Sequence, residues 1–302
     1  MHFSQQIVLV AALAACTSAH GTVTKITGAN GVVMPGLTIQ DGTPRDCSSN
    51  GCGSQADTAI IRDREIASGK ATPLGRTQGN GPVDASVMIA AFMGSGATPP
   101  ANNGASGSVG VEDNIQQKRQ LLGGLLGGGK GKGAGATGLG GLLGGGGAKS
   151  NGPPEAGVAA AQGAGASTGL PTCATDGTVT MTLRQINQDG AGPFTADVDG
   201  TSGGTDEAAM QPATVTQDVP GLGIQGLSLA TNTDFEMKVQ MPAGMTCDAT
   251  VGGASNVCVM RVRNGAGAGP FGGSVAFTQS AGARKRAIAY RLKKRMELNR
   301  KL

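Results

Sequence analysis

The chain has 302 residues and a formal net charge of +4 at pH 7, and it contains no tryptophan and only two histidines, His2 and His20. So few imidazoles exclude most hydrolases that need an internal histidine base held by a third group, such as a Ser-His-Asp or Cys-His site. No apolar stretch reaches the roughly 20 residues that a membrane-spanning helix needs.

Residues 1–19 predict a secretory signal peptide. An apolar run from Ile7 to Cys16 is followed by the small residues Thr17-Ser18-Ala19, which is the pattern that signal peptidase cleaves. Cleavage after Ala19 makes His20 the first residue of a secreted, extracellular protein.

Five cysteines remain after this cleavage, and an oxidising compartment favours disulfides. Short loops make Cys47–Cys52 and Cys247–Cys258 the candidate pairs, although spacing alone does not fix the connectivity. The spacings are poor zinc motifs because no histidine lies beside them. Cys173 is then either free or joined to another chain.

Residues 20–115 and 168–282 predict two parts of one all-β domain, of a comfortable size for a single fold. Three segments alternate small or apolar with polar residues and are bounded by turn residues, as half-buried antiparallel strands are: Thr178–Asn187, Phe235–Met241 and Val257–Asn264. We also expect a strand directly after His20, and Gln55–Ser68 has room for a short helix.

Residues 116–167 separate these parts and predict a disordered, glycine-rich insertion. Such a composition buries too little apolar surface to offset the entropy of ordering the backbone. The dibasic pair Lys118-Arg119 near its start resembles the sites cut by processing proteases of the secretory pathway. An ordinary exposed charge pair is the alternative.

Two segments share the pattern NxxGAGPF, namely Asn187–Phe194 and Asn264–Phe271, and each directly follows an alternating strand. In each, a proline restricts φ and a phenylalanine can anchor the loop on the core. No helix pattern follows either segment, so we interpret them as edge loops of a β-sandwich rather than phosphate-binding loops.

Residues 283–302 form a basic tail that we expect to be partly helical. Residues 284–302 carry nine Lys or Arg and one Glu, which gives +8 and leaves +4 − 8 = −4 for the rest of the chain. A basic extension can contact nucleic acid, anionic lipid or acidic wall polymer. We favour a solvated tail and expect no nucleic-acid partner.

His20 is the candidate metal ligand. It is the only histidine left after cleavage, and its imidazole and α-amino nitrogens can chelate one ion in the planar arrangement that suits Cu(II). The amine has a reference pKa of about 7.7–8.0 and is partly deprotonated near neutrality. Copper is therefore the one cofactor that we consider.

Five segments are the most distinctive: HGTVTKITGANGVVMPGL, DGTPRDCSSNGCGSQADTAIIRDREIASGKATPLGRTQGNGPVDA, VGVEDN, DGTVTMTLRQINQDGAGPFTADVD and NVCVMRVRNGAGAGPFGG. In this order they resemble the Egh-like family of secreted, appressorium-associated virulence factors of pathogenic fungi. The resemblance covers both folded parts, while the insertion and the tail lie outside it. It implies a protein of infection structures that contributes to host penetration and has no established reaction.

The Ala-His-Gly start and the two GAGPF stretches also resemble the lytic polysaccharide monooxygenases. This second resemblance implies an immunoglobulin-like antiparallel β-sandwich with long loops, in which His20 is the bidentate copper ligand and Phe271 lies at the axial copper face. The second histidine of that copper site has no counterpart here, which argues against oxidative catalysis.

We therefore favour a secreted, monomeric virulence factor without catalysis, which acts at a host surface or on a cell-wall polymer. The alternative is a copper-binding, monooxygenase-like protein that acts on a wall polysaccharide. A third hypothesis is a precursor that releases fragments at Lys118-Arg119 or at the dibasic pairs of the tail.

Overall fold

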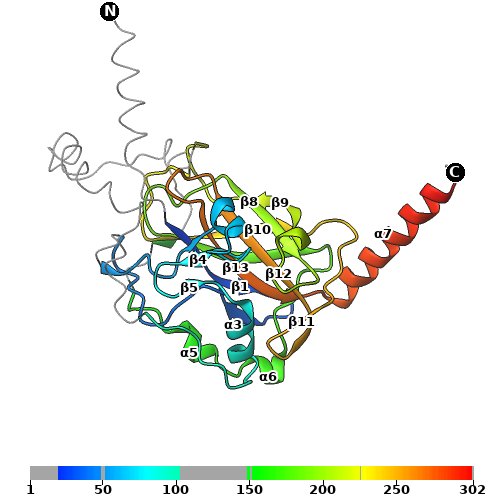
Figure 1. The fold of residues 1–302 in the computed structure, drawn as a ribbon, viewed down its shortest axis with the longest axis horizontal. Helices are drawn as coiled ribbons and strands as arrows, with labels where there is room; N and C mark the ends of the chain where they lie inside the picture. Colours follow the sequence, from blue (N-terminus) through cyan, green and yellow to red (C-terminus); the bar gives the residue numbers. More distant parts are fainter. Residues whose placement is uncertain (1–19, 49–51, 103–147, 150–151, 225, 301–302) are drawn as a thin grey trace, which may run out of the picture.

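The computed structural model describes residues 20–48, 52–102, 148–149, 152–224 and 226–300. Within these ranges the chain is mostly antiparallel β-sheet, surrounded by long loops and short helices, with one long helix at the carboxyl end (Figure 1). The all-β prediction is confirmed. The signal peptide, the pair Lys118-Arg119 and most of the glycine-rich insertion lie outside the described residues.

The strands form one hydrogen-bonded path. Its order is β2 (Val33–Pro35), β1 (Gly21–Thr27), β7 (Thr178–Gln185), β10 (Thr233–Gln240), β9 (Gln211–Gln217), β8 (Phe194–Asp199), β12 (Ala254–Asn264), β13 (Phe271–Thr278), β3 (Ala59–Ile60), β4 (Arg76–Thr77) and β5 (Gly81–Pro82). Two short strands lie off this path: β6 (Ala148–Lys149) pairs with β10, and β11 (Ala249–Val251) pairs with β12.

The path curls on itself, so that its two halves face each other as in a sandwich. Strand β9 joins the halves because it pairs with β10 on one side and with β8 on the other. Across the interior β1 packs on β13, where a Cβ built on Gly273 would lie 3.0 Å from the Cβ of Val23. Glycine at this position therefore permits the close approach of the two strands.

The alternating segments form strands as predicted, and β7 and β10 bury alternate side chains in the core. Strand β7 buries three of its side chains there and β10 buries another three: Val179, Met181 and Leu183, and Phe235, Met237 and Val239. Strand β12 differs from the expected half-buried strand, because both of its faces are buried from Val257 to Val262. Strand β13 is buried along its length from Phe271 to Phe277. With so few aromatic residues, the interior is built mainly from aliphatic and methionine side chains.

The helices lie outside the sheet. They are α2 (Asp63–Ala67), α3 (Ala85–Phe92), α5 (Gly157–Ala161), α6 (Gly165–Thr168), the 3₁₀ helix η3 (Glu207–Ala209) and α7 (Ala281–Asn299). Helix α2 confirms the short helix expected within Gln55–Ser68, and α7 shows that most of the basic tail is helical. No helix in the described ranges is both long and apolar enough to cross a membrane.

The end of the predicted insertion differs from the expectation, because residues 152–168 contain α5 and α6. The Asp41 carboxylate accepts hydrogen bonds from the first backbone amides of α5, at 3.0 Å from Val158 and 2.7 Å from Ala159. Glu155 pairs with Arg45 at 3.0 Å. These partners lie more than a hundred residues away in the sequence, so local composition did not indicate them.

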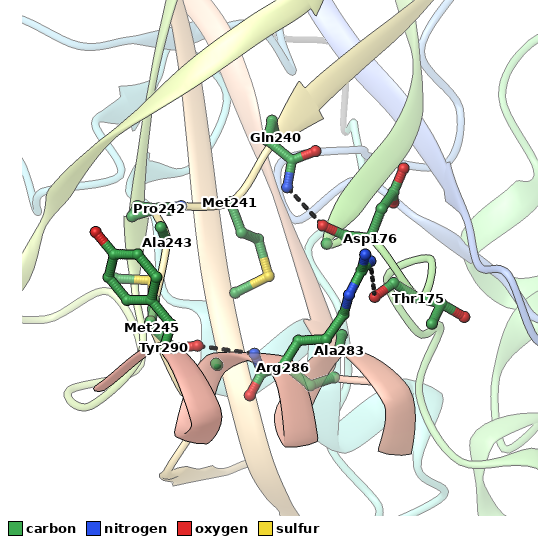
Figure 2. Close-up of a pocket in the computed structure, with 14 residues that line it drawn as sticks. Thr175, Asp176, Gln240, Met241, Pro242, Ala243, Met245, Ala283, Arg286 and Tyr290 are labelled. Atoms are coloured by element: carbon green, nitrogen blue, oxygen red, sulfur yellow. Dashed lines mark hydrogen bonds between the residues drawn. The ribbon is translucent and has the colours of Figure 1, made fainter. Parts of the chain in front are cut away.

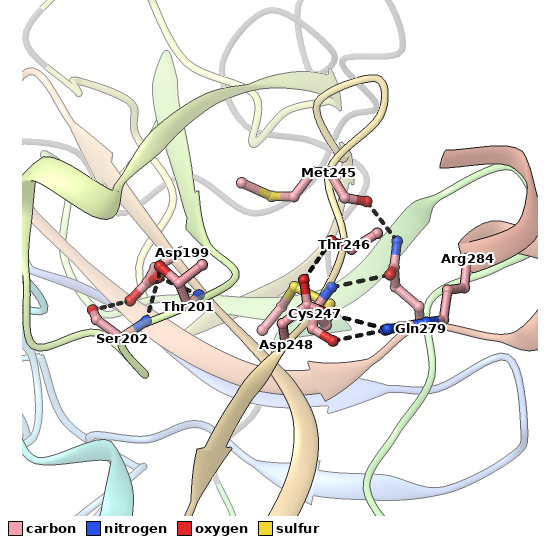
Figure 3. Close-up of a disulfide and its surroundings, with 10 residues drawn as sticks. Asp199, Thr201, Ser202, Met245, Thr246, Cys247, Asp248, Gln279 and Arg284 are labelled. Atoms are coloured by element: carbon pink, nitrogen blue, oxygen red, sulfur yellow. Dashed lines mark hydrogen bonds and ion pairs between the residues drawn. A yellow bond between two sulfur atoms is a disulfide. The ribbon is translucent and has the colours of Figure 1, made fainter. Parts of the chain in front are cut away.

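Both candidate cysteine pairs form disulfides, Cys47–Cys52 and Cys247–Cys258. The second is fully buried and links the segment before β11 to β12 (Figure 3). Cys173 has a free, buried thiol, and burial raises the pKa of that thiol.

Asp199, at the end of β8, organises the turn beside the buried disulfide (Figure 3). Its carboxylate accepts hydrogen bonds from the backbone amides of Thr201 at 2.7 Å, Ser202 at 2.9 Å and Gly204 at 2.6 Å, and from the Ser202 hydroxyl. Burial raises the pKa of Asp199, but these donors outweigh burial and the pKa lies below its ordinary value.

The buried disulfide should contribute more to stability than the other one. Replacing Cys247 and Cys258 together by Ala is expected to lower the free energy of unfolding by about 2–4 kcal/mol, because the unfolded chain gains freedom and two buried sulfur atoms are removed. Denaturant titration of the secreted protein measures the loss. The matched control replaces Cys47 and Cys52, which are partly exposed and close a shorter loop. An equal or larger loss in that control would contradict the expectation.

Asp199 should make stability depend on pH below about 4. Because its folded pKa is lowered, the stability that its ionised form contributes is present above the unfolded pKa and is lost as the pH falls through the folded pKa. Asp199→Asn is therefore expected to destabilise the protein by about 1–3 kcal/mol at pH 7 and by less in acid. Denaturant titrations from pH 7 to about 3, with exposed Asp46→Asn as control, measure the difference. A destabilisation that stays constant with pH would refute this role.

Candidate functional site

The two GAGPF segments are matching loops at one end of the sandwich. Asn187–Phe194 leads from β7 into β8, and Asn264–Phe271 leads from β12 into β13. In each loop the Gly–Pro peptide bond is cis. Each ends with its phenylalanine as the first residue of the next strand, and both rings are buried as predicted. The sequence repeat thus corresponds to two equivalent turns.

Asn264 ties the two loops together. Its side-chain amide nitrogen donates to the carbonyl oxygens of Asp189 at 3.0 Å and Ala191 at 3.2 Å, both in the other loop. Its side-chain oxygen accepts from the backbone nitrogens of Ala266 at 3.2 Å and Phe271 at 3.1 Å in its own loop. One buried side chain therefore fixes both loops as a single unit.

His20 lies against this unit because β1 pairs with β7. Its carbonyl oxygen accepts from the backbone nitrogen of Ile186 at 2.9 Å, and its own backbone nitrogen donates to the side-chain oxygen of Asn187 at 2.7 Å. The imidazole packs on the ring of Phe271, with centroids 4.4 Å apart and planes tilted by 34°. In the full-length chain His20 is fully buried.

Two glycines allow this close packing of His20 on the first loop. A Cβ added to Gly190 would lie 2.2 Å from the His20 carbonyl oxygen, and one added to Gly21 would lie 2.7 Å from the Gly190 carbonyl oxygen. Any larger residue at either position would push the chain start away from the loop. Glycine at position 190 is thus required by the neighbouring chain start, whereas a Cβ on Gly192 would lie 2.5 Å from the Val219 carbonyl oxygen.

The structure brings together the two residues that the monooxygenase resemblance singles out, His20 and Phe271. The donor set, however, does not fit a copper site with two histidines, because His20 is the only histidine in the sequence after residue 2. Among the described residues, no three side chains of His, Cys, Asp or Glu gather closely enough to hold a metal ion. If residues 1–19 are removed, His20 would offer an imidazole and an α-amino nitrogen, and the Asn187 amide oxygen lies 2.7 Å from the α-nitrogen.

Sequence reasoning missed a buried ion network between the strands and the end of the insertion. Arg45 donates to both carboxylate oxygens of the fully buried Asp57, at 3.2 and 2.5 Å, and also pairs with Glu155. Arg184 of β7 donates to the Arg45 carbonyl oxygen and pairs with Asp234 of β10 at 3.1 Å. Burial lowers the pKa of Arg45, but the carboxylates outweigh burial and raise it above its ordinary value.

This network links separate segments of the fold. Each of its arginines is charge-paired with at least one carboxylate, and the network joins Arg45, Asp57 and Glu155 to β7 and β10. No local sequence signal marks it, because its members are isolated charges in separate parts of the chain. Only the proximity of β7 and β10 in the sheet brings Arg184 and Asp234 together.

Comparison with known proteins gives the chain its family. The model of the Egh16-like virulence factor family matches residues 18–272. The Appressoria-specific virulence factor GAS2 of Pyricularia oryzae is 52% identical over 297 residues, which cover 98% of this chain and 95% of that protein. The Appressoria-specific virulence factor GAS1 of the same organism is 39% identical over 129 residues, which cover 41% of this chain and 50% of that protein.

No solved structure matches the chain. The family match covers both parts of the sandwich and includes His20, the two GAGPF loops and both disulfides. It ends at residue 272, before α7. The extent of the family match and the similarity to GAS2 over nearly the whole length show that the chain belongs to the Egh16-like virulence factor family.

Proposed function

We propose that the chain is a secreted virulence factor of fungal infection structures, which acts outside the cell at the host surface or on a cell-wall polymer. The observation that carries the proposal is the 52% identity to the appressoria-specific virulence factor GAS2, over 98% of the chain. The family match points in the same direction. Secretion is supported by the apolar run before His20 and by two disulfides, which persist in oxidising compartments.

We favour binding over catalysis as the way in which the protein acts. The mature chain keeps one imidazole, and that imidazole packs on Phe271. The buried arginines Arg45, Arg184 and Arg261 are each paired with carboxylates and hold segments of the fold together. Their pairing supports a structural role for these arginines rather than a set of reacting groups.

Deleting the gene in the fungus that makes this protein is expected to reduce host penetration. Expressing the full chain should restore penetration, whereas a chain that starts with Met followed by residues 20–302 should not, because it stays inside the cell. Counting penetrated host cells under formed appressoria measures the effect. Restoration by the form without residues 2–19 would contradict an extracellular site of action.

The mass of the secreted product tests two further predictions from the sequence, cleavage after Ala19 and cleavage after Lys118-Arg119. A product that begins at His20 agrees with cleavage after Ala19. A break after Lys118-Arg119 would favour the precursor hypothesis, and an unbroken chain would argue against it.

The second candidate function is copper binding at His20. The observation that favours it is the packing of the His20 imidazole on Phe271, with Asn187 beside the α-nitrogen. A bound copper ion would supply redox chemistry at this end of the sandwich. His20 would hold it through two nitrogens, and Asn264 would keep the surrounding loops in place.

The secreted protein is expected to bind one Cu(II) with a submicromolar dissociation constant, and His20→Ala should abolish this binding. Calorimetric titration measures the affinity, and electron paramagnetic resonance should show nitrogen coupling. Acetylation of the α-amine should weaken binding at least about tenfold, because it removes one of the two nitrogens. Binding that is unchanged in His20→Ala, or no binding to the unmodified protein, would exclude the site.

A further inference from the structure

Helix α7 extends from the body of the molecule as a basic arm (Figure 1). It spans Ala281–Asn299, and two residues separate it from β13. The Ser280 hydroxyl accepts from the backbone nitrogen of Ala283 at 3.3 Å. The family model matches as far as residue 272, two residues into β13, whereas the similarity to GAS2 covers 98% of the chain.

The first turns of α7 fix the helix to the body. Ala283 and Ala287 are buried against it. Arg284 donates to the Cys247 carbonyl oxygen at 2.9 Å and pairs with Asp248 at 3.0 Å, while Arg286 donates to the Thr175 carbonyl oxygen at 3.2 Å (Figures 2 and 3). The helix is thus held at its root and keeps a defined direction.

Tyr290 packs on the loop after β10, next to the root of the helix (Figure 2). A Cβ built on Gly244 would lie 2.8 Å from the ring of Tyr290, so the ring lies directly over the glycine backbone. From Arg291 onward every described residue of the helix is exposed. The outer half of α7 is therefore available to a partner.

An apolar stripe runs along the exposed side of α7. Ile288, Leu292 and Met296 follow one another at intervals of four residues, which places them on one face of a helix. Their exposed fractions are 45%, 54% and 58%. Three large apolar side chains in a row on a strongly basic helix form a surface that water solvates poorly.

The stripe is surrounded by positive charge, which the body neutralises only in part, through the ion pair of Arg284 with Asp248. Residues 284–302 carry nine Lys or Arg and one Glu. In the described part of α7 the ion pairs are Arg284 with Asp248 and Lys293 with Glu297, the latter at 4.0 Å between mostly exposed groups. Helical geometry places Lys285 and Arg295 on the same side as the stripe.

The apolar stripe and the positive charge around it together indicate what kind of partner α7 binds. A second copy of α7 would match the stripe but would bring two strongly positive helices into contact, which electrostatic repulsion opposes. An acidic polysaccharide would match the charge but would leave the apolar side chains in water. A bilayer with anionic lipids offers negative headgroups and an apolar interior at the same surface.

We propose that α7 is a membrane-surface anchor, which lies on bilayers that contain anionic phospholipid and inserts Ile288, Leu292 and Met296 below the headgroups. Its basic side chains then face the lipid phosphates and carboxylates. The root contacts keep the sandwich attached at the membrane surface. This function goes beyond the proposed virulence role and does not depend on it.

Vesicle flotation of the secreted protein tests the proposal. Binding to vesicles of phosphatidylcholine with about 30% phosphatidylserine should be at least about tenfold tighter than binding to phosphatidylcholine alone, and about 0.5 M salt should remove the difference. The double variant Leu292→Ser/Met296→Ser leaves the charge unchanged and should weaken binding at least about tenfold. Leu229→Ser, which alters an equally exposed leucine in a loop of the body, is the matched control and should bind normally.

A second variant separates the contribution of charge from that of the stripe. Lys285→Gln/Arg295→Gln retains the apolar side chains and should weaken binding several-fold at low salt. Equal binding to neutral and anionic vesicles, or full binding by Leu292→Ser/Met296→Ser, would overturn the proposal. If sedimentation shows that the protein is a dimer and that the serine variant is a monomer, the stripe is an interface with a second copy and the membrane proposal is wrong. If polygalacturonate displaces the vesicles and binds the serine variant as tightly as the unmodified protein, the partner of the basic side chains is an acidic polysaccharide and the membrane proposal is wrong.

Discussion

The antiparallel pairing of β1 with β7 is the interaction on which the amino-terminal end of the molecule depends. It places Gly21 opposite Gln185, although the whole first part of the domain and the insertion separate the two residues in the sequence. Forming the pair therefore costs loop-closure entropy that local contacts do not offset. This register brings His20 to Ile186 and Asn187. A shift of one residue would turn Val23 out of the core, and burial of this side chain therefore fixes the position of His20.

The same pairing explains why two similar loops play different roles. Asn264 and Asn187 occupy equivalent places, but Asn264 is enclosed between the loops and bonds to both of them. Asn187 lies next to β1 and bonds to the backbone nitrogen of His20 instead. The predicted cleavage after Ala19 would turn that nitrogen into an amine, which is partly charged near neutrality. The amide oxygen of Asn187 is suited to this change because it accepts from either form.

The sequence predicted those features whose signal is local. Strands β7, β10 and β12 follow from alternation, and the short-range disulfides follow from spacing, because in both cases the partners or the pattern lie within a few residues. The contact of His20 with Phe271 was indicated by resemblance alone. The network around Arg45 and the helices α5 and α6 were missed, because they depend on partners distant in the chain and because the glycine content of the insertion hid its ordered end.

The two surfaces for which we propose functions lie at opposite ends of β7. The start of β7 lies beside the root of α7, where Arg286 bonds to Thr175, and its end leads to the loop that holds His20. An eight-residue strand spans roughly 26 Å, so the two surfaces do not share residues. The body carries the excess of negative charge and α7 the excess of positive charge. An anionic surface therefore attracts the helix and repels the body, which orients the molecule with the His20 end directed away from that surface.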